Sequence, residues 1–295
     1  MTNAIYLITV NYYSTDSVTQ LVSSLSANPV NSYQLIIVNN SPEDRSIFSL
    51  QADSCSILDA QSNIGFGRAC NLGLEWVYSR DSNAIVWIIN PDAYVAENAL
   101  IRANLFFSTH PEVSILGTVV YEPNGKIWFG EGEFVADTGE ITVCDRITKM
   151  LSSDSTIPYI PAKWVTGCSL LIDLKHFSEV PAFDPDYFLY YEDFDFCQRY
   201  ASQGYSIALT RELEAFHYPS SITGRNPHLK LRHSIYSYLL ALEKHTDPSV
   251  LWTRFFRIAL AAAIALPTQP QQALAKWQAI LTYSKRTLKK WLIPS

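Results

Sequence analysis

The stretch Ala84-Ile-Val-Trp-Ile-Ile-Asn-Pro-Asp92 is typical of a short buried strand that ends directly in polar residues. Six consecutive apolar positions, rich in β-branched side chains, favour a strand covered on both faces, as in a parallel sheet. The Asn-Pro-Asp that follows suits a turn, and it would also hold one carboxylate rigidly at the strand end. The stretch therefore predicts an α/β fold with polar groups at one edge of its sheet.

The first half of the chain alternates such strands with helices. Strands are predicted at 5–10, 35–38, 56–58, 84–89 and 114–119, and helices at 15–27, 68–79 and 97–108. This alternation predicts a mainly parallel sheet with helices on both faces, and ligands bind such sheets beyond the carboxyl ends of the strands. Asn11, Asn39 and Asp92 fall at or just beyond strand ends, so we expect them to converge on one rim.

The second half is less regular and contains an unusual acidic and aromatic run. A hairpin region is predicted at 125–144, strands at 164–172 and 205–209, and helices at 193–203 and 228–245. The run Phe183–Arg199 mixes aromatic side chains with five carboxylates, which are Asp184, Asp186, Glu192, Asp193 and Asp195. An aromatic stretch packs against the core, where burial raises carboxylate pKa values and can produce a general base. The alternative is an aromatic loop before a helix capped by acids.

The net charge of −6 over 295 residues hides a strong asymmetry. Residues 1–247 carry 15 Lys and Arg against 28 Asp and Glu, whereas residues 248–295 carry seven basic residues and no acid. The acidic body argues against nucleic acid as a partner. Five scattered cysteines without zinc-type spacing indicate reduced thiols in a cytoplasmic protein.

The basic tail at 250–295 also carries tryptophans, among them Trp291, which points to an anionic membrane surface. Its apolar segment 258–266 is too short to span a bilayer, because a spanning helix takes about 20 residues. Leucines recur at helical spacing among lysines over 274–292, which predicts a basic amphipathic helix. The alternative is a helix packed on the domain with a solvated basic face.

Two further patterns bear on ligand chemistry. Asp92 paired with His217 would make an open site for Mg²⁺ or Mn²⁺ on diphosphate oxygens, although each residue alone is weak evidence. Gly65-Phe66-Gly67 lacks the third glycine of a dinucleotide-binding turn, since Cys70 stands there, so NAD is not expected. The chain also has no Walker-type phosphate loop and no G-x-S-x-G elbow.

Six motifs occur in an order that resembles a known family. They are Val10-Asn-Tyr12, Ile37-Val-Asn-Asn-Ser41, Asn63-Ile-Gly-Phe-Gly-Arg-Ala-Cys-Asn71, Asn90-Pro-Asp92, Thr166-Gly-Cys168 and Tyr191-Glu-Asp-Phe-Asp195. Together they resemble the inverting glycosyltransferases of family 2 with the GT-A fold, in particular the rhamnosyltransferase-like branch. The resemblance covers roughly residues 4–245.

The resemblance implies roles for individual residues. The nucleotide-sugar donor would contact Asn11, Tyr12, Asn39, Asn63, Gly65, Arg68, Asn71 and Asp92. Asp92 and His217 would hold the Mg²⁺ or Mn²⁺ ion, and the acceptor would lie against Gly167, Cys168 and Tyr191. Asp193 would act as the general base, with Glu192 orienting the acceptor or competing as the base. The chain departs from the family at Asn39 and Asn90, where acids are usual, which puts the strength of metal binding in doubt.

These observations predict an inverting glycosyltransferase with a GT-A domain over 1–247 and a basic amphipathic helical tail over 248–295. The domain would divide into a nucleotide-binding half (about 1–120) and an acceptor-binding half (about 121–247). The donor would be dTDP-rhamnose or a UDP-sugar, and the acceptor a glycan or lipid-linked molecule of bacterial surface-polysaccharide synthesis. The expected location is the inner face of the cytoplasmic membrane. A catalytically silent nucleotide-sugar-binding protein and a two-carboxylate glycoside hydrolase are the alternatives.

Overall fold

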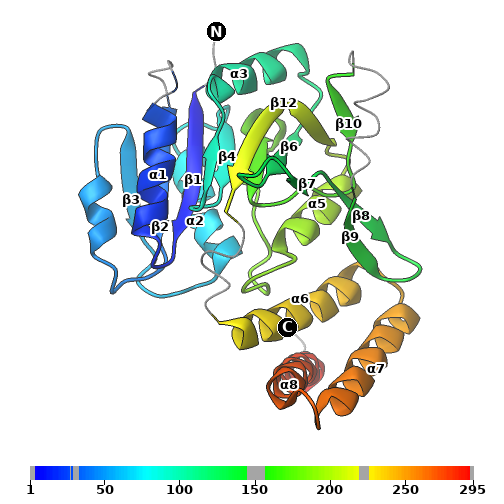
Figure 1. Cartoon of the computed structure of the whole chain (residues 1–295). Coiled ribbons are helices and arrows are strands. Elements are labelled where there is room, and N and C mark those ends of the chain that lie inside the picture. Colours follow the sequence, from blue (N-terminus) through cyan, green and yellow to red (C-terminus); the bar gives the residue numbers. More distant parts are fainter. Residues whose placement is uncertain (1–3, 27, 29–32, 145–156, 219–225, 293–295) are drawn as a thin grey trace.

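A ten-stranded mixed sheet forms the centre of the molecule, with strands in the order β10-β12-β6-β11-β4-β1-β2-β3 (Figure 1). Two further strands join its side, because β5 pairs with β12 and β7 pairs with β6. This computed structural model describes residues 4–26, 28, 33–144, 157–218 and 226–292. The predicted α/β fold with a mainly parallel sheet and C-terminal helices is confirmed.

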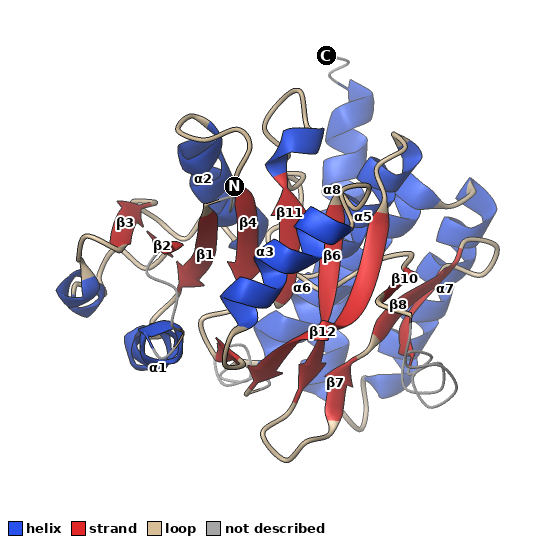
Figure 2. Ribbon diagram, turned by 90° about the horizontal axis from the view of Figure 1, so that it is seen from above, coloured by secondary structure: helices blue, strands red, loops and turns tan. Residues whose placement is uncertain are grey.

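The first half of the sheet follows the predicted alternation closely. Its parallel strands are β1 (Ile5–Asn11), β2 (Tyr33–Asn39), β3 (Cys55–Asp59) and β4 (Ile85–Ile89). Every residue of β4 is buried, as its unbroken apolar run predicts. The connecting helices α1 (Thr15–Ser26) and α2 (Phe66–Tyr78) cover opposite faces (Figure 2). Crossovers of this kind bring the carboxyl ends of β1, β2 and β4 to one edge.

The second half of the sheet contains antiparallel strands that the sequence only partly indicated. Its elements are β5 (Ala93–Val95), α3 (Ala99–Thr109), β6 (Ile115–Tyr121), β7 (Ile127–Phe129), β10 (Tyr159–Pro161), β11 (Ser169–Asp173) and β12 (Ile207–His217). Strand β11 lies antiparallel between β4 and β6.

Two predicted strand boundaries in this half were wrong. The strand expected at 164–172 begins only at Ser169, because a turn precedes it in which the Ser169 N–H donates to the Thr166 carbonyl at 3.2 Å. The strand expected at 205–209 extends to His217, since an irregularity between Thr210 and Glu214 lets β12 keep pairing with β6 and then with β5.

The remaining elements gather beside and below the sheet in Figure 1. They are the hairpin β8 (Glu131–Val135) and β9 (Glu140–Cys144), and the helices α5 (Glu192–Ser202), α6 (Pro227–His245), α7 (Pro248–Ala265) and α8 (Pro270–Leu292). Helices α6, α7 and α8 lie together at one end of the molecule, and α3 lies at the opposite end.

The structure adds two features to the helical tail that the sequence predicted. The apolar segment predicted at 258–266 belongs to the 18-residue helix α7, the one helix in the described part of the chain that is long and apolar enough to cross a membrane by length and composition. Helix α8 packs on α6 through Tyr283, which is buried against Leu239 and Leu242. Its leucine row faces solvent instead. The side chains of Lys290 and Trp291 lie outside the described residues.

Candidate active site

The ends of β1 and β2 carry a pair of buried amides. Asn11 and Asn39 are partners in the strand register, and the Asn11 Nδ2 donates to Asn39 Oδ1 at 3.1 Å and to Asp44 Oδ2 at 3.2 Å. The backbone N–H of Ser14 donates to Asn11 Oδ1 at 3.0 Å, which fixes the orientation of that amide. Within the described part of the chain, the Asn39 Nδ2 is buried without a hydrogen-bond partner. Tyr12 lies beside this pair with 41% of its surface exposed.

The turn that precedes α2 is built by asparagine side chains and one glycine. Asn63 Oδ1 accepts from the Gly65 N–H at 3.1 Å and from Asn40 Nδ2 at 3.0 Å. Gly65 has φ +88°, and a Cβ there would lie 2.4 Å from the carbonyl oxygen of Phe188. Only glycine fits this position, because the acidic and aromatic run passes directly over the turn.

Two predicted donor-binding residues on α2 hold that run by its backbone. Arg68 Nε donates to the Pro185 carbonyl at 2.8 Å. Asn71 makes two hydrogen bonds to the backbone of Phe183, each 2.8 Å long. Both side chains therefore hold the acidic and aromatic run Phe183–Arg199 in position, and their contact with a nucleotide stays a prediction.

Asp92 and His217 come together where β5 pairs with the end of β12. His217 Nε2 lies 3.2 Å from Asp92 Oδ1, and both side chains are more than nine-tenths buried. The Trp128 ring packs edge-on against the imidazole at 4.4 Å, and the His217 Nδ1 has no hydrogen-bond partner among the residues that the structure describes. Two ligands at right angles on an octahedral Mg²⁺ lie about 3 Å apart. A carboxylate and an imidazole at this spacing fit the predicted cation.

Asp193 lies at the start of α5 with its carboxylate held by backbone N–H groups. Its Oδ2 accepts from Gly167 at 2.9 Å and its Oδ1 from Phe194 at 2.8 Å. Burial raises the pKa of Asp193 although these bonds and one from Thr166 oppose the rise. The Cys168 carbonyl accepts from the Asn90 N–H at 3.0 Å, so the Gly167–Cys168 segment that holds Asp193 also contacts the turn that carries Asp92. Burial raises the pKa of the Cys168 thiol, and the charges of Asp92 and Asp193 add to the effect. The structure thus brings the predicted base and the predicted metal ligand to one site.

Glu192 points away from this position and into the protein. It is 6% exposed, its Oε2 has no hydrogen-bond partner, and Gly67 on α2 leaves room for it. A Cβ at Gly67 would lie 3.5 Å from the Glu192 side chain and 2.9 Å from Phe183. Burial, with a smaller contribution from Asp193, raises the pKa of Glu192 to about 8. The Glu192 carboxyl is therefore mostly neutral at pH 7.

The other three acids of the run are ion-paired. Asp195 accepts from Arg199 Nε at 2.7 Å and lies 2.9 Å from His245 Nε2. Its pKa is lowered because these bonds, and the charges of Arg199 and Lys244, outweigh burial. Lys244 pairs with Asp184, and Arg286 of α8 pairs with Asp186 at 2.6 Å. The pKa values of Glu192 and Asp193 are raised, as the sequence predicted for some acids of this run.

Tyr191 forms the backbone corner that starts α5. Its φ of 63° and the φ of 69° at Tyr190 are both left-handed, a conformation that non-glycine residues adopt at a cost. Ser237 of α6 donates to the Leu189 carbonyl at 2.8 Å and holds this corner in place. The Tyr191 ring lies 5.7 Å from that of Tyr238, beside the predicted acceptor side.

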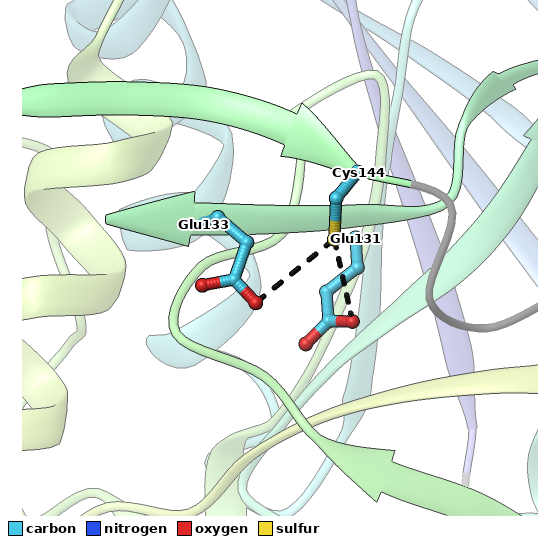
Figure 3. A group of neighbouring side chains, drawn as sticks. All are labelled: Glu131, Glu133 and Cys144. Carbon is cyan, nitrogen blue, oxygen red and sulfur yellow. Dashed lines mark hydrogen bonds between the residues drawn. The ribbon is translucent and has the colours of Figure 1, made fainter. Parts of the chain in front are cut away.

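A second group of potential metal ligands lies on the β8–β9 hairpin (Figure 3). The Cys144 Sγ lies 3.7 Å from Glu131 Oε2 and 3.9 Å from Glu133 Oε1, and Lys163 pairs with Glu133 at 3.4 Å. The sequence analysis missed this group. Glu131 and Cys144 are distant in the chain and meet only because they are register partners in the hairpin.

Several known proteins resemble this chain in sequence. The model of the family described as "Glycosyl transferase family 2" matches residues 5–163. An N-acetylglucosaminyl-diphospho-decaprenol L-rhamnosyltransferase of Mycobacterium tuberculosis is 23% identical over 90% of this chain and 92% of its own length. The low-salt glycan biosynthesis hexosyltransferase Agl10 of Haloferax volcanii is 22% identical over 74% of this chain and 68% of its own.

Solved glycosyltransferase structures share the fold. A structure of GalNAc-T7 with UDP, GalNAc and Mn²⁺ superposes with a TM-score of 0.63 at 12% identity, covering 92% of this chain and 53% of that one. This chain therefore spans about half of that protein. A mannosyltransferase of Pyrobaculum calidifontis with GDP-mannose and Mn²⁺ gives a TM-score of 0.55 at 13% identity, covering 99% and 88% of the two chains. The expected GT-A fold is confirmed.

Proposed function

This chain belongs to glycosyl transferase family 2, and we propose that it is an inverting enzyme that moves a hexose from a nucleotide donor to a lipid-linked or glycan acceptor. The mycobacterial relative is named as an enzyme that transfers L-rhamnose to N-acetylglucosaminyl-diphospho-decaprenol, which is a lipid-linked acceptor. We carry both classes over, with dTDP-rhamnose as the first donor to test and UDP-sugars as the second. The process would be bacterial surface-polysaccharide synthesis.

The position of Asp193 carries the proposed mechanism. Asp193 is half-buried, and the backbone N–H groups of Gly167 and Phe194 hold its carboxylate, one on each oxygen. The pKa of Asp193 is raised toward neutral pH, which suits a general base. Asp193 takes the hydroxyl proton as that oxygen bonds to the anomeric carbon and the bond to the diphosphate breaks. One such displacement inverts the anomeric centre.

Glu192 is assigned a different role from Asp193. It is buried against α2, and its pKa near 8 keeps it neutral at the working pH. A neutral Glu192 carboxyl adds no second negative charge beside Asp193, the proposed base. Glu192 therefore supports the position of α5, and only Asp193 removes the proton.

The donor would lie along the rim from β1 to β5. Asn11, Tyr12 and Asn39 would contact the nucleobase, and Asn63, Gly65, Arg68 and Asn71 would shape the turn beside it. Asp92 and His217 would hold Mg²⁺ or Mn²⁺, which when bound stabilises the negative charge of the departing diphosphate. Gly167, Cys168 and Tyr191 would line the acceptor side. The burial of Asp92 and His217 excludes water from the side chains that orient the diphosphate.

We place the protein in the cytoplasm, at the inner face of the membrane that holds the lipid-linked acceptor. Residues 1–247 would form the catalytic domain, with the donor half at about 1–120 and the acceptor half at about 121–247. The tail at 248–295 would make the membrane contact. The ion pair between Arg286 and Asp186 joins this tail to the acidic and aromatic run, and the pair between Arg286 and Glu243 joins it to α6.

A thermal-shift titration tests the proposal. Purified protein is titrated with dTDP, UDP, GDP and their common sugar conjugates, each with and without Mn²⁺. A ligand that binds the native state raises Tm by mass action. We expect dTDP or UDP to raise Tm, and to raise it further with Mn²⁺. A rise in Tm that is identical with and without Mn²⁺ would contradict metal binding by Asp92 and His217. The absence of any shift in Tm would contradict the proposed donor class.

A further inference from the structure

Helix α7 exposes a continuous apolar ridge on the side that faces away from the protein. Trp252, Phe256, Leu260 and Ile264 recur every fourth residue and are 50%, 65%, 62% and 67% exposed. Residues at this spacing lie along one side of a helix. A row of large exposed apolar side chains is unusual on a soluble surface and marks a place that another apolar phase covers.

The opposite side of α7 is anchored to the protein. Leu251 and Ala262 are buried, and Phe255 and Ile258 pack on the cluster formed with α6 and α8. At the start of the helix, Arg254 Nε donates to the Thr138 carbonyl in the β8–β9 turn at 2.6 Å. Because one side is packed on protein along the helix, α7 is held against the molecular surface with its ridge outward. That geometry suits a helix lying in a membrane interface rather than one spanning a bilayer.

The charge around the ridge identifies the kind of surface that it fits. Residues 248–295 hold seven basic residues and no acid, on a chain whose remaining part is strongly acidic. Arg257 on α7 is exposed, as are Lys285 and Lys289 on α8. Helix α8 also leaves an apolar row to solvent, formed by Leu274, Leu281 and Leu288. Exposed apolar side chains beside exposed cations match a lipid surface with anionic headgroups.

We propose that α7 docks on an anionic lipid bilayer by inserting the ridge Trp252, Phe256, Leu260 and Ile264, with the basic residues of α7 and α8 contacting the headgroups. This inference deepens the membrane location given above and rests on it. The ion pair between Arg286 and Asp186 then holds the acidic and aromatic run at a fixed place relative to the bilayer.

Vesicle co-sedimentation without donor or acceptor tests the docking separately from the transferase chemistry. The full chain is mixed with vesicles of phosphatidylglycerol and phosphatidylcholine, and with vesicles of phosphatidylcholine alone. The test variant is Phe256→Gln with Leu260→Gln. The matched control is Ile101→Gln with Leu105→Gln on α3, whose side chains are 44% and 60% exposed at the opposite end of the molecule (Figure 1).

The expected result has three parts. The wild-type chain binds the anionic vesicles, the ridge variant partitions at least about tenfold more weakly because two apolar side chains no longer insert, and the α3 control binds like wild type. Lys285→Gln with Lys289→Gln weakens binding to anionic vesicles by about tenfold or more and leaves the weak binding to neutral vesicles unchanged.

Equal binding by the wild type and the ridge variant would overturn the proposal. A wild-type chain that ignores vesicles but is a dimer by light scattering, with the ridge variant monomeric, would also overturn it and assign the ridge to a second copy of the chain. Unchanged circular dichroism and Tm in the ridge variant establish that it folds. A wild-type chain that binds vesicles but transfers no sugar in a separate assay would count against the proposed function and not against the docking.

Discussion

Replacing Glu192 with glutamine should make the protein more stable at alkaline pH and leave it unchanged at acid pH. Burial raises the pKa of this carboxyl from 4.5 to about 8 in the folded state. A carboxyl that binds its proton more tightly when folded loses stability as the pH rises from its unfolded pKa toward its folded pKa. One pKa unit is worth about 1.4 kcal/mol, so the difference reaches about 3 kcal/mol at pH 7 and about 4 kcal/mol at pH 8, with a limit of about 5 kcal/mol at higher pH. Glutamine keeps the shape of the neutral acid and removes this dependence.

The assay is Tm against pH between 4.5 and 8.5 for the wild type and Glu192→Gln. A chain of 295 residues has an unfolding entropy of about 0.6 kcal/mol per degree near Tm, so 3 kcal/mol corresponds to about 5 °C. Glu75→Gln is the matched control, because Glu75 is an exposed acid on α2. A difference in Tm between Glu192→Gln and the wild type that stays constant over this pH range would refute the claim that Glu192 is buried and neutral.

Three other substitutions test separate parts of the structure. Gly65→Ala should destabilise the fold by more than about 2 kcal/mol in urea unfolding, since a Cβ at φ +88° would meet the Phe188 carbonyl oxygen. His217→Ala should abolish the part of the nucleotide thermal shift that depends on Mn²⁺ and keep the part that does not; loss of both would show a folding defect. Arg286→Ala should cost about 1 kcal/mol, less in high salt, because Asp186 is partly exposed; a cost unaffected by salt would count against the ion pair.

Much of the fold could be predicted because its central strands carry strong local signals. The apolar runs of β1, β2 and β4 are buried on both faces, and polar residues end each of them. The three-residue strand β5 has no such pattern, and its partner in β12 is more than a hundred residues away. The insertion of β11 between β4 and β6 is equally non-local, so the sequence placed a strand there without its start or its direction.

The candidate site was predictable to the extent that strand ends and motifs locate it. Strand ends placed Asn11 and Asn39 on one rim, and motif order placed Asp193 and His217. The sequence could not separate Glu192 from Asp193, because they differ only in the side of α5 that they face. It also could not assign Asp184 and Asp186 to ion pairs, since Lys244 and Arg286 lie 60 and 100 residues further along the chain.

The tail shows a similar limit. Helical spacing predicted that the leucines of α8 form its apolar face, but alanines and Tyr283 make the contact with the protein. Periodicity identifies an apolar row and does not say whether protein or another phase covers it. The ridge on α7 became visible only once the packed side of that helix was known.

The most direct measurement is sugar transfer by Asp193→Asn and Glu192→Gln, assayed beside nucleotide binding by each variant. If Asp193 removes the acceptor proton, Asp193→Asn loses about 10²- to 10⁴-fold in kcat while its affinity for the donor nucleotide stays within about twofold. Glu192→Gln keeps most of the transfer rate, because the side chain it replaces is already neutral. Transfer that survives in Asp193→Asn and disappears in Glu192→Gln would contradict the account and make Glu192 the base.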